Sequence, residues 1–229
     1  MAKDERKTIL IRRGLDKGSC IPLCDYVLNY VTIDPISRRL EDRSLIVTGG
    51  ERDNDMPEPQ TPRPDSVAYE KLDRDTFNDG LSLGRNGRIL APLADPLLEE
   101  LTGSCEAKVL TFDLDDQDAN FFAQNIRKGP LGYSFELVYK PASDLGTRMI
   151  NRFVPGYDKN LFVGVTIASS DINDVLNSVI AFGCASLMKV EPQHLRDALL
   201  RYAFSSRPKE AKQEVTKEDI LGMREFEED

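Results

Sequence analysis

The sequence predicts an α+β fold, in which a mixed or antiparallel sheet carries helices on at least one face and a disordered C-terminal tail follows. Three observations support this prediction. Strand-like and helix-like segments alternate without a regular repeat, which disfavours a doubly wound fold. The segments whose apolar residues recur at helical spacing lie mainly in the C-terminal half. Beyond residue 206 the chain is charged and poorly apolar, so it cannot offset the entropy cost of ordering.

The first 50 residues read as a β-rich segment. Residues 7–12 are apolar and β-branched, which indicates a strand, and residues 44–48 form a second strand that ends at Gly49. Between them, residues 21–33 are rich in Tyr, Val, Leu and Ile, but their period fits a helix and a strand equally well.

Residues 51–79 read as an acidic, proline-rich loop or linker, with four prolines between Glu51 and Pro64 and few residues to bury. The expected division is therefore a segment 1–50, the linker 51–79, a main α+β domain 80–205 and a tail 206–229. Whether residues 1–50 form a separate unit stays open.

The main domain begins with a short helix that Asp95 and Pro96 start, followed by a strand over 106–112. Asp115 or Asp116 then caps an expected helix that runs to Ile126. Alternation of apolar and polar residues over 133–139 is typical of a half-buried strand.

Residues 161–168 are apolar on both faces and predict a central, buried strand, and a helix follows it. A last helix begins at Pro192. The expected core comprises Val163, Val165, Ile167, Val175, Leu176 and Val179.

The charge of the chain restricts its partners. The formal net charge of −9 disfavours broad binding to a phosphate backbone. Residues 1–19 nevertheless hold six basic and three acidic side chains. The candidate nucleic-acid-binding residues are Arg12, Arg13, Arg38 and Arg39.

The sequence also limits the cellular compartment of the protein and the chemistry of its cysteines. The first residues carry charges of both signs with no apolar segment behind them, and no apolar run reaches membrane-spanning length, so a cytoplasmic location is expected. The four cysteines and His194 lack the two close ligand pairs of a structural zinc site, so no metal site is predicted.

The strongest chemical signal is the apolar strand Val109–Phe112 followed by Asp113-Leu114-Asp115. This Asp-x-Asp strand end resembles the first motif of the haloacid dehalogenase-like phosphohydrolases. The resemblance implies a nucleophile at Asp113, a general acid/base at Asp115 and a bound Mg²⁺. The alternative is structural: Asp115, Asp116 and Asp118 occupy the first turn of a helix and satisfy its free N–H groups. The sequence does not decide between a metal site and a helix cap.

The tail offers a candidate partner-binding segment, because Ile220, Leu221, Met223 and Phe226 lie within an acidic stretch that can fold against a groove. The leading hypothesis is a non-enzymatic protein-binding or self-assembly protein, a class that includes virus-encoded structural and accessory proteins, with no cofactor. The alternatives are a Mg²⁺-dependent phosphohydrolase that uses Asp113 and Asp115, and a nucleic-acid binder. The sequence identifies neither the partner nor the oligomeric state.

Overall fold

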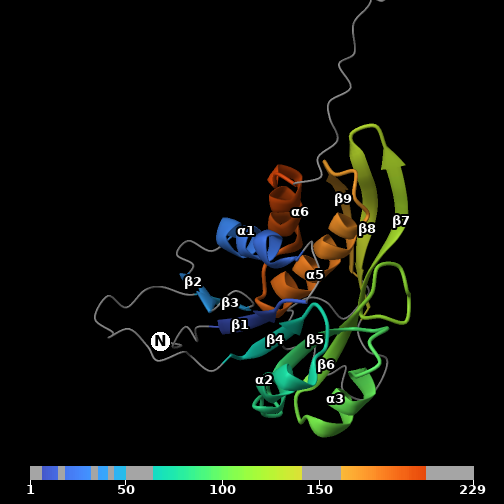
Figure 1. Cartoon of the computed structure of the whole chain (residues 1–229). Coiled ribbons are helices and arrows are strands. Elements are labelled where there is room, and N and C mark those ends of the chain that lie inside the picture. Colours follow the sequence, from blue (N-terminus) through green and yellow to red (C-terminus); the bar gives the residue numbers. More distant parts are fainter. Residues whose placement is uncertain are drawn as a thin grey trace, which may run out of the picture.

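The computed structural model describes residues 7–14, 19–31, 36–40, 44–49, 64–140 and 161–204. Within these residues a single nine-stranded sheet has the strand order β2-β3-β1-β4-β5-β6-β7-β8-β9 (Figure 1). The strands are β1 Lys7–Arg12, β2 Ile36–Leu40, β3 Ser44–Gly49, β4 Ser66–Tyr69, β5 Arg88–Pro92, β6 Lys108–Phe112, β7 Phe121–Gly129, β8 Gly132–Tyr139 and β9 Leu161–Ile167. The helices are α1 Ile21–Val31, η2 Arg74–Thr76, α2 Phe77–Leu81, α3 Leu98–Ser104, α5 Asn173–Leu187 and α6 Pro192–Arg201. The predicted α+β class with a mixed sheet and packed helices is confirmed.

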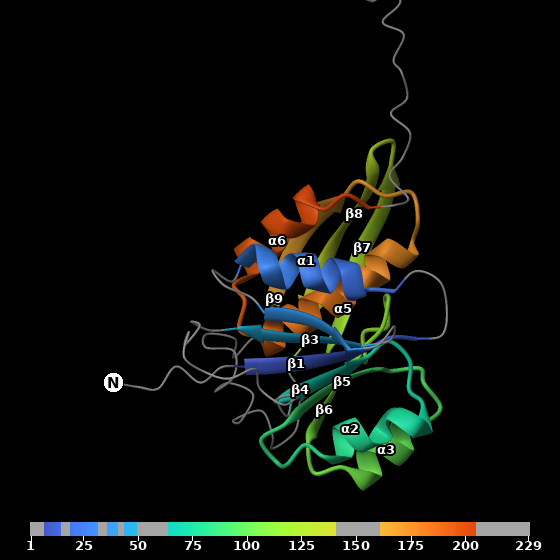
Figure 2. The ribbon, with the colours of Figure 1, turned by 60° about the vertical axis from the view of Figure 1, so that its left-hand side comes forward.

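Parallel pairing joins β1, β4, β5, β6 and β7, whereas β2, β3, β8 and β9 pair in antiparallel fashion. Helices α1, α5 and α6 cover one face of the sheet, and α2 and α3 cover the opposite face (Figure 2). Both faces of β1 are therefore buried: Ile9 and Ile11 pack on the α1 and α5 side, and Leu10 packs on the α2 and α3 side. This two-sided burial explains why parallel strands read as continuous apolar runs.

Several expected elements are confirmed. The strands over 7–12, 44–48, 106–112 and 133–139 correspond to β1, β3, β6 and β8. The ambiguous stretch 21–33 contains helix α1, whose buried residues Leu23, Cys24, Val27 and Leu28 recur at helical spacing.

The helix predicted from Asp115 to Ile126 is wrong, because this segment contains a turn followed by strand β7. Asp116 Oδ1 accepts a hydrogen bond from Asp118 N at 2.8 Å, so the acidic cluster closes a turn rather than capping a helix. Phe121 and Ala123 enter the main core, and Phe122 packs on the other face. This alternation is the period of a strand.

The central position predicted for residues 161–168 is also wrong. Strand β9 is an edge strand, and Phe162 on its outer face is 54% exposed. Of the expected core residues, Leu176 is only partly buried. The buried ones are Val163, Val165, Ile167, Val175 and Val179.

Some expectations lie outside the described residues: the first part of the predicted linker, to residue 63, and the tail with Ile220, Leu221, Met223 and Phe226. The division into an N-terminal segment, linker, main domain and tail stays a prediction, although β4 lies within the predicted linker and pairs directly with β1. Across the described part of the chain, no helix has the length and apolar character needed to cross a bilayer.

A buried amine at the start of β6 leads to one stability prediction. Lys108 Nζ is buried and has no hydrogen-bond partner among the described residues, and its neighbour across the β5–β6 pair is the buried Arg88. Burial, followed by the charge of Arg88, lowers the pKa of Lys108. The burial of this amine without a partner among the described residues therefore lowers the free energy of unfolding.

We expect Lys108→Met to raise the free energy of unfolding by about 1 kcal/mol at neutral pH, because it removes an unpaired buried polar group. The pKa of Lys108 is lower in the folded state, so the unfolded chain binds more protons and the wild type gains stability as pH rises toward the ordinary lysine value. The difference in free energy of unfolding between the variant and the wild type should therefore shrink as the pH rises. Urea titrations at several pH values check this, and a destabilised Lys108→Met would contradict it.

Candidate functional site

The carboxyl ends of β1 and β4 form a topological switch point. These strands are parallel neighbours, but the chain leaves β1 toward α1 on one face and leaves β4 toward η2 and α2 on the other (Figure 2). The two connections diverge and leave a crevice beyond the strand ends. In open α/β sheets, ligands bind in crevices at such points.

A pocket of about 390 Å³ occupies this crevice, and we call it the carboxyl-edge pocket. Its walls come from the residues that follow β1, β4 and β5. They are Arg12, Arg13, Gly14, Lys71, Leu72, Asp73, Arg74, Thr76 and Leu97. The volume lies within the range of small-molecule sites.

The charge of this pocket is positive. Arg12 Nε donates to Asp79 Oδ2 at 2.6 Å, and Arg74 Nη2 donates to Glu100 Oε2 at 2.8 Å. Arg13 and Lys71 are exposed and have no hydrogen bond or ion pair to another described residue. Two cations are therefore available to a ligand.

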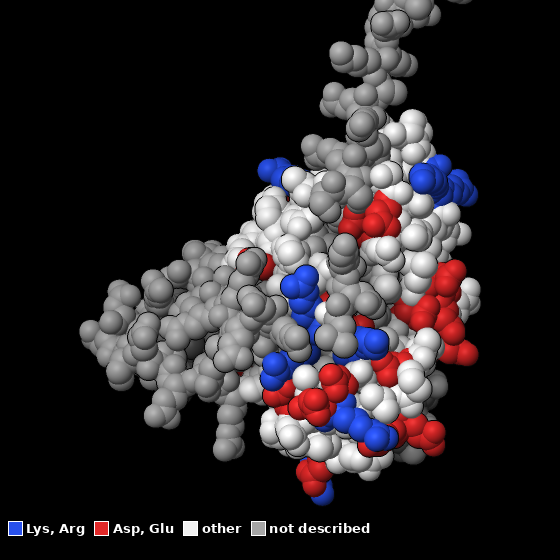
Figure 3. Space-filling view, in the orientation of Figure 1, with Lys and Arg blue, Asp and Glu red and all other residues white. Residues whose placement is uncertain are grey.

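Asp73 is the one acidic residue among the described residues that line the pocket, and its carboxylate accepts from Asp75 N at 3.0 Å. On the face shown in Figure 3, the Lys and Arg side chains of the described residues form separate small groups among Asp and Glu. This mixed pattern suits a compact anionic ligand better than a long polyanion.

Glu70 closes the neighbouring position at the start of α1. Its carboxylate accepts hydrogen bonds from Gly14 N at 2.7 Å, and from Cys20 N and the Ser19 hydroxyl at 2.5 Å. The N-terminus of a helix after a first strand is a common phosphate site. Here a carboxylate of the chain itself accepts hydrogen bonds from those donors, so they are not free to bind an anion.

One carboxylate, that of Asp95, positions the two leucines of the pocket lining. Asp95 Oδ2 accepts from Leu72 N, and Asp95 Oδ1 accepts from Leu97 N, both at 3.0 Å. The residue expected to start a helix therefore also ties the segment after β4 to the segment after β5. This link fixes the positions of Leu72 and Leu97 in the pocket lining.

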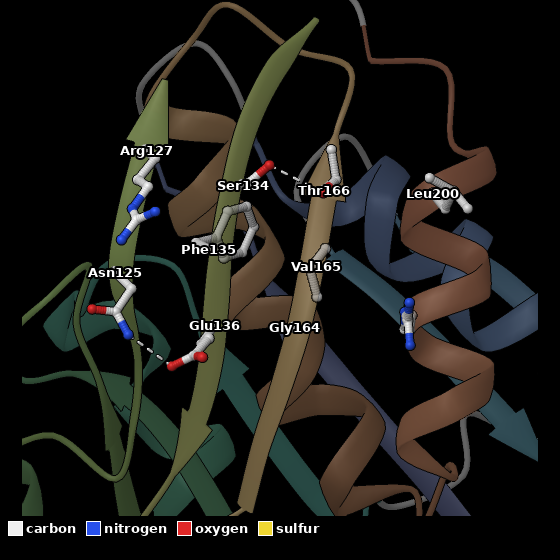
Figure 4. Close-up of a pocket in the computed structure, with 10 residues that line it drawn as sticks. Asn125, Arg127, Ser134, Phe135, Glu136, Gly164, Val165, Thr166 and Leu200 are labelled. Carbon is white, nitrogen blue, oxygen red and sulfur yellow. Dashed lines mark hydrogen bonds between the residues drawn. The ribbon is translucent and has the colours of Figure 1, made fainter. Parts of the chain in front are cut away.

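A second and larger hollow, of about 560 Å³, lies over β7, β8 and β9 beside α6 (Figure 4). We call it the β-face trough. Its lining includes Asn125, Arg127, Glu136, Thr166 and Arg196. It shares no residue with the carboxyl-edge pocket.

The Asp-x-Asp pair lies apart from both hollows. Asp113 and Asp115 follow β6, where Asp113 Oδ1 accepts from Asp115 N at 3.4 Å, and neither residue lines a described pocket. The described residues contain no group of three or more His, Cys, Asp or Glu placed to hold a metal ion. Of the arginines proposed for nucleic acid, Arg12 and Arg13 line the carboxyl-edge pocket, whereas the side chains of Arg38 and Arg39 on β2 are outside the described part.

Three of the four cysteines meet in the core between α1 and α5. The Cys24 thiol is hydrogen-bonded to the thiols of Cys20 and Cys184, and all three are 0% exposed. The bond from Cys24 lowers the pKa of Cys20, but burial and the charge of Glu70 outweigh it and raise that pKa to about 12. These thiols stay protonated and pack as apolar groups, while Cys105 is only partly buried and His194 is exposed on α6.

Comparisons with known proteins bear on the fold. No model of a known protein family matches the sequence. No curated protein matches it either. Among solved structures, the chain is similar to UDP-N-acetylmuramate:L-alanyl-gamma-D-glutamyl-meso-diaminopimelate ligase from Neisseria meningitides, with 13% identity and a TM-score of 0.51 over 87% of this chain and 67% of that one. It is also similar to a murein peptide ligase from Psychrobacter arcticus, with 14% identity and a TM-score of 0.50 over 80% of this chain and 44% of that one.

The chain spans less than half the length of several similar structures, and 30% of the UDP-N-acetylmuramoylalanyl-D-glutamyl-2,6-diaminopimelate–D-alanyl-D-alanyl ligase from Acinetobacter baumannii, which is 15% identical with a TM-score of 0.45. At such identities the likeness is one of fold.

This fold overturns the expected function. The chain has the fold of ligases, which are enzymes, so the prediction of a non-enzymatic binding or assembly protein, and with it a viral structural role, is wrong. The helix-cap reading of Asp115, Asp116 and Asp118 is wrong, because the expected helix is strand β7. The phosphohydrolase that uses Asp113 and Asp115 stays a prediction. Nucleic-acid binding through the arginines of the N-terminal segment stays a prediction, in which Arg12 is already paired with Asp79.

Sequence reasoning missed Glu70 and Lys71, which follow β4. Each lies 56 or more residues from the β1 segment that it faces, and neither belongs to a recognisable motif. Only the pairing of β1 with β4 brings them to the site.

Proposed function

We propose that this chain is the substrate-holding core of a ligase-type enzyme and that it binds an anionic substrate, bearing carboxylate or phosphate, in the carboxyl-edge pocket. The observation that carries this proposal is the placement of Arg13 and Lys71, without acidic partners in the described part of the chain, at a topological switch point. The fold agrees, because similar structures include a murein peptide ligase and a ligase named for UDP-N-acetylmuramate, an anion.

The two cations have complementary chemistry. A guanidinium such as that of Arg13 can donate two parallel hydrogen bonds to one carboxylate or phosphate, and the Lys71 ammonium acts as a mobile point charge. They follow the ends of the adjacent parallel strands β1 and β4. A Cβ built on Gly14, the residue after Arg13, would lie 3.5 Å from Lys71 Cβ. An anion between them would contact both sides of the crevice.

Lys71→Gln should weaken binding of pyrophosphate and of citrate by roughly 10- to 100-fold, the value of one hydrogen bond to a charged group. Isothermal titration calorimetry of the full chain measures this, and the wild-type affinity should fall as ionic strength rises. The matched control is Arg85→Gln, because Arg85 is exposed and, among the described residues, forms an ion pair with Glu106 alone, at 3.5 Å. Equal affinities in wild type, Lys71→Gln and Arg85→Gln would reject the pocket as the site.

The state of the cysteines supports the compartment that we propose. All four are free thiols, and three of them touch without forming a disulfide. Free thiols in contact suit a reducing compartment, which supports a cytoplasmic location. Fractionation that places the protein outside the cytoplasm would contradict this part of the proposal.

A further inference from the structure

The β-face trough contains a carboxylate with only one of its oxygens hydrogen-bonded. Asn125 Nδ2 donates to Glu136 Oε2 at 2.9 Å (Figure 4), and Gln124 Nε2 donates to the same oxygen at 2.8 Å. The bond from Gln124, followed by the bond from Asn125, lowers the pKa of Glu136, so this side chain is charged at neutral pH. The other oxygen, Oε1, accepts no hydrogen bond from the described residues and is available to a cationic donor.

Two guanidinium groups line the same trough. Arg127 extends from β7 and Arg196 from α6, and both residues are exposed. Neither has a hydrogen bond or ion pair to another described residue. The charged part of the lining therefore consists of two available cations and one fixed anion, Glu136.

Exposed apolar side chains adjoin these charges. Leu200 of α6 lines the trough and is 61% exposed (Figure 4). Phe162 is 54% exposed and lies on the same face of β9 as Gly164, because successive residues of a strand alternate between its faces. The trough and its border therefore offer apolar as well as charged contacts, which suits a peptide segment with side chains of both kinds.

The floor of the trough is open because residue 164 is a glycine. A Cβ built on Gly164 would meet no atom within 4 Å, and the φ of this residue is outside the left-handed region. Neither packing nor backbone conformation therefore requires glycine there. Glycine inside a strand often marks a place where another backbone approaches closely, and here it leaves space on β9 between β8 and α6 (Figure 4).

The chain itself contains a segment with complementary chemistry, residues 218–229. This segment has six acidic side chains and a single basic one, Arg224. It also contains the four apolar residues of the candidate partner-binding segment, which are Ile220, Leu221, Met223 and Phe226. Several anions and one cation in the segment match two cations and one anion in the trough, and such charge complementarity fixes the register of a contact.

The described part of the chain ends beside the trough. Helix α6 supplies Arg196 and Leu200 to the lining, and the described residues end three positions after this helix, at Phe204. The 13 residues from 205 to 217 can span at most about 45 Å, which is ample for the segment 218–229 to return to α6. Tethering over such a length gives an effective concentration on the order of a millimolar. A contact of only millimolar affinity would therefore be occupied about half of the time.

From this arrangement we propose that residues 218–229 dock in the β-face trough of the same molecule. Arg224 donates to Glu136 Oε1, the oxygen that has no donor among the described residues. Acidic side chains of the segment pair with Arg127 and Arg196. The docked segment covers the trough and excludes other ligands from it, so this surface is occupied by the chain's own C-terminal residues.

The test uses the full chain with a site for a specific protease placed between residues 217 and 218, which is folded first and then cut. Cutting removes the tether, so at micromolar concentration the segment should dissociate and the amide resonances of Gly164 and Thr166 should shift. A synthetic peptide of residues 218–229 should return them to their original positions, with a dissociation constant on the order of a millimolar. Trough resonances that do not change on cutting would overturn the proposal. So would resonances of the uncut chain that change on dilution, because the segment would then dock on a second copy.

Glu136→Gln separates the specific pair from general attraction between charges. The variant removes a negative charge from the trough, so general attraction alone predicts tighter binding of the acidic peptide to the cut chain. The pair with Arg224 predicts binding that is about tenfold weaker or more. A peptide with Arg224→Gln should show the same loss, and combining the two changes should add little to it, because both remove one interaction. Tighter binding by Glu136→Gln would overturn the proposal.

The remaining variants locate the contact. Arg127→Gln and Arg196→Gln should each weaken binding of the peptide, whereas Arg85→Gln should bind it like the wild type. A peptide in which Arg224 and Glu225 are exchanged keeps composition and net charge, and it should bind more weakly than the native one. Equal affinity of these two peptides would contradict the proposed register. Lys71→Gln should leave docking unchanged, so failure here is separable from failure at the carboxyl-edge pocket.

Discussion

Phe182→Ala should lower the free energy of unfolding by about 3–5 kcal/mol, the cost of removing a buried aromatic side chain and leaving a cavity. Phe182 is 2% exposed on α5 and packs edge-on against Phe121, with ring centroids 5.5 Å apart and planes at 88°. Phe121 in turn contacts Tyr139 at 5.0 Å. This aromatic group joins α5 to β7 and β8, where the parallel and antiparallel parts of the sheet meet.

Phe162→Ala is the matched control, because the same side chain is removed from an exposed position on β9. Its effect should stay below about 1 kcal/mol. Guanidinium chloride titrations of both variants give the comparison. Equal losses would mean that α5 does not pack against this part of the sheet.

Glu70→Ala is expected to cost about 2–4 kcal/mol, because hydrogen bonds to a charged carboxylate are stronger than neutral ones and three of their donors lose an acceptor. The donors are Gly14 N, the Ser19 hydroxyl and Cys20 N, which come from the end of β1 and the start of α1. The side chain is therefore expected to hold strand and helix together, although it belongs to neither.

Glu70→Gln separates charge from geometry. The amide keeps an acceptor oxygen, so this variant should lose less stability than Glu70→Ala. Glu106→Ala removes an exposed carboxylate whose ion-pair partner Arg85 is 3.5 Å away, and it should cost almost nothing. If Glu70→Ala matched Glu106→Ala in thermal and denaturant unfolding, the hydrogen bonds to Glu70 would not matter to the fold.

The sequence predicted elements well where local pattern and final burial agree. Strand β8 alternates cleanly, and α5 and α6 keep apolar residues on one face, so periodicity identified all three. The segment 115–126 failed because its aspartates are equally suited to a turn and to a helix cap, and only pairing of β7 with β8 decides the outcome. The edge position of β9 also depends on long-range pairing.

The candidate site was less predictable than the fold. Arg12 and Arg13 stood out as basic residues after a strand, but their partners come from other segments. Arg12 pairs with Asp79, 67 residues away, and Gly14 pairs with Glu70. A site that assembles from the ends of strands distant in sequence leaves no spaced motif to recognise.

The most direct test of the central claim is to map where an anion binds on the wild-type chain by following backbone amide resonances during titration with pyrophosphate. The account predicts saturable shifts centred on Gly14 and on Leu72 to Arg74, with the amides of Gly164 and Thr166 in the β-face trough unaffected. Shifts centred away from the carboxyl ends of β1 and β4, or no saturable shifts at all, would contradict it.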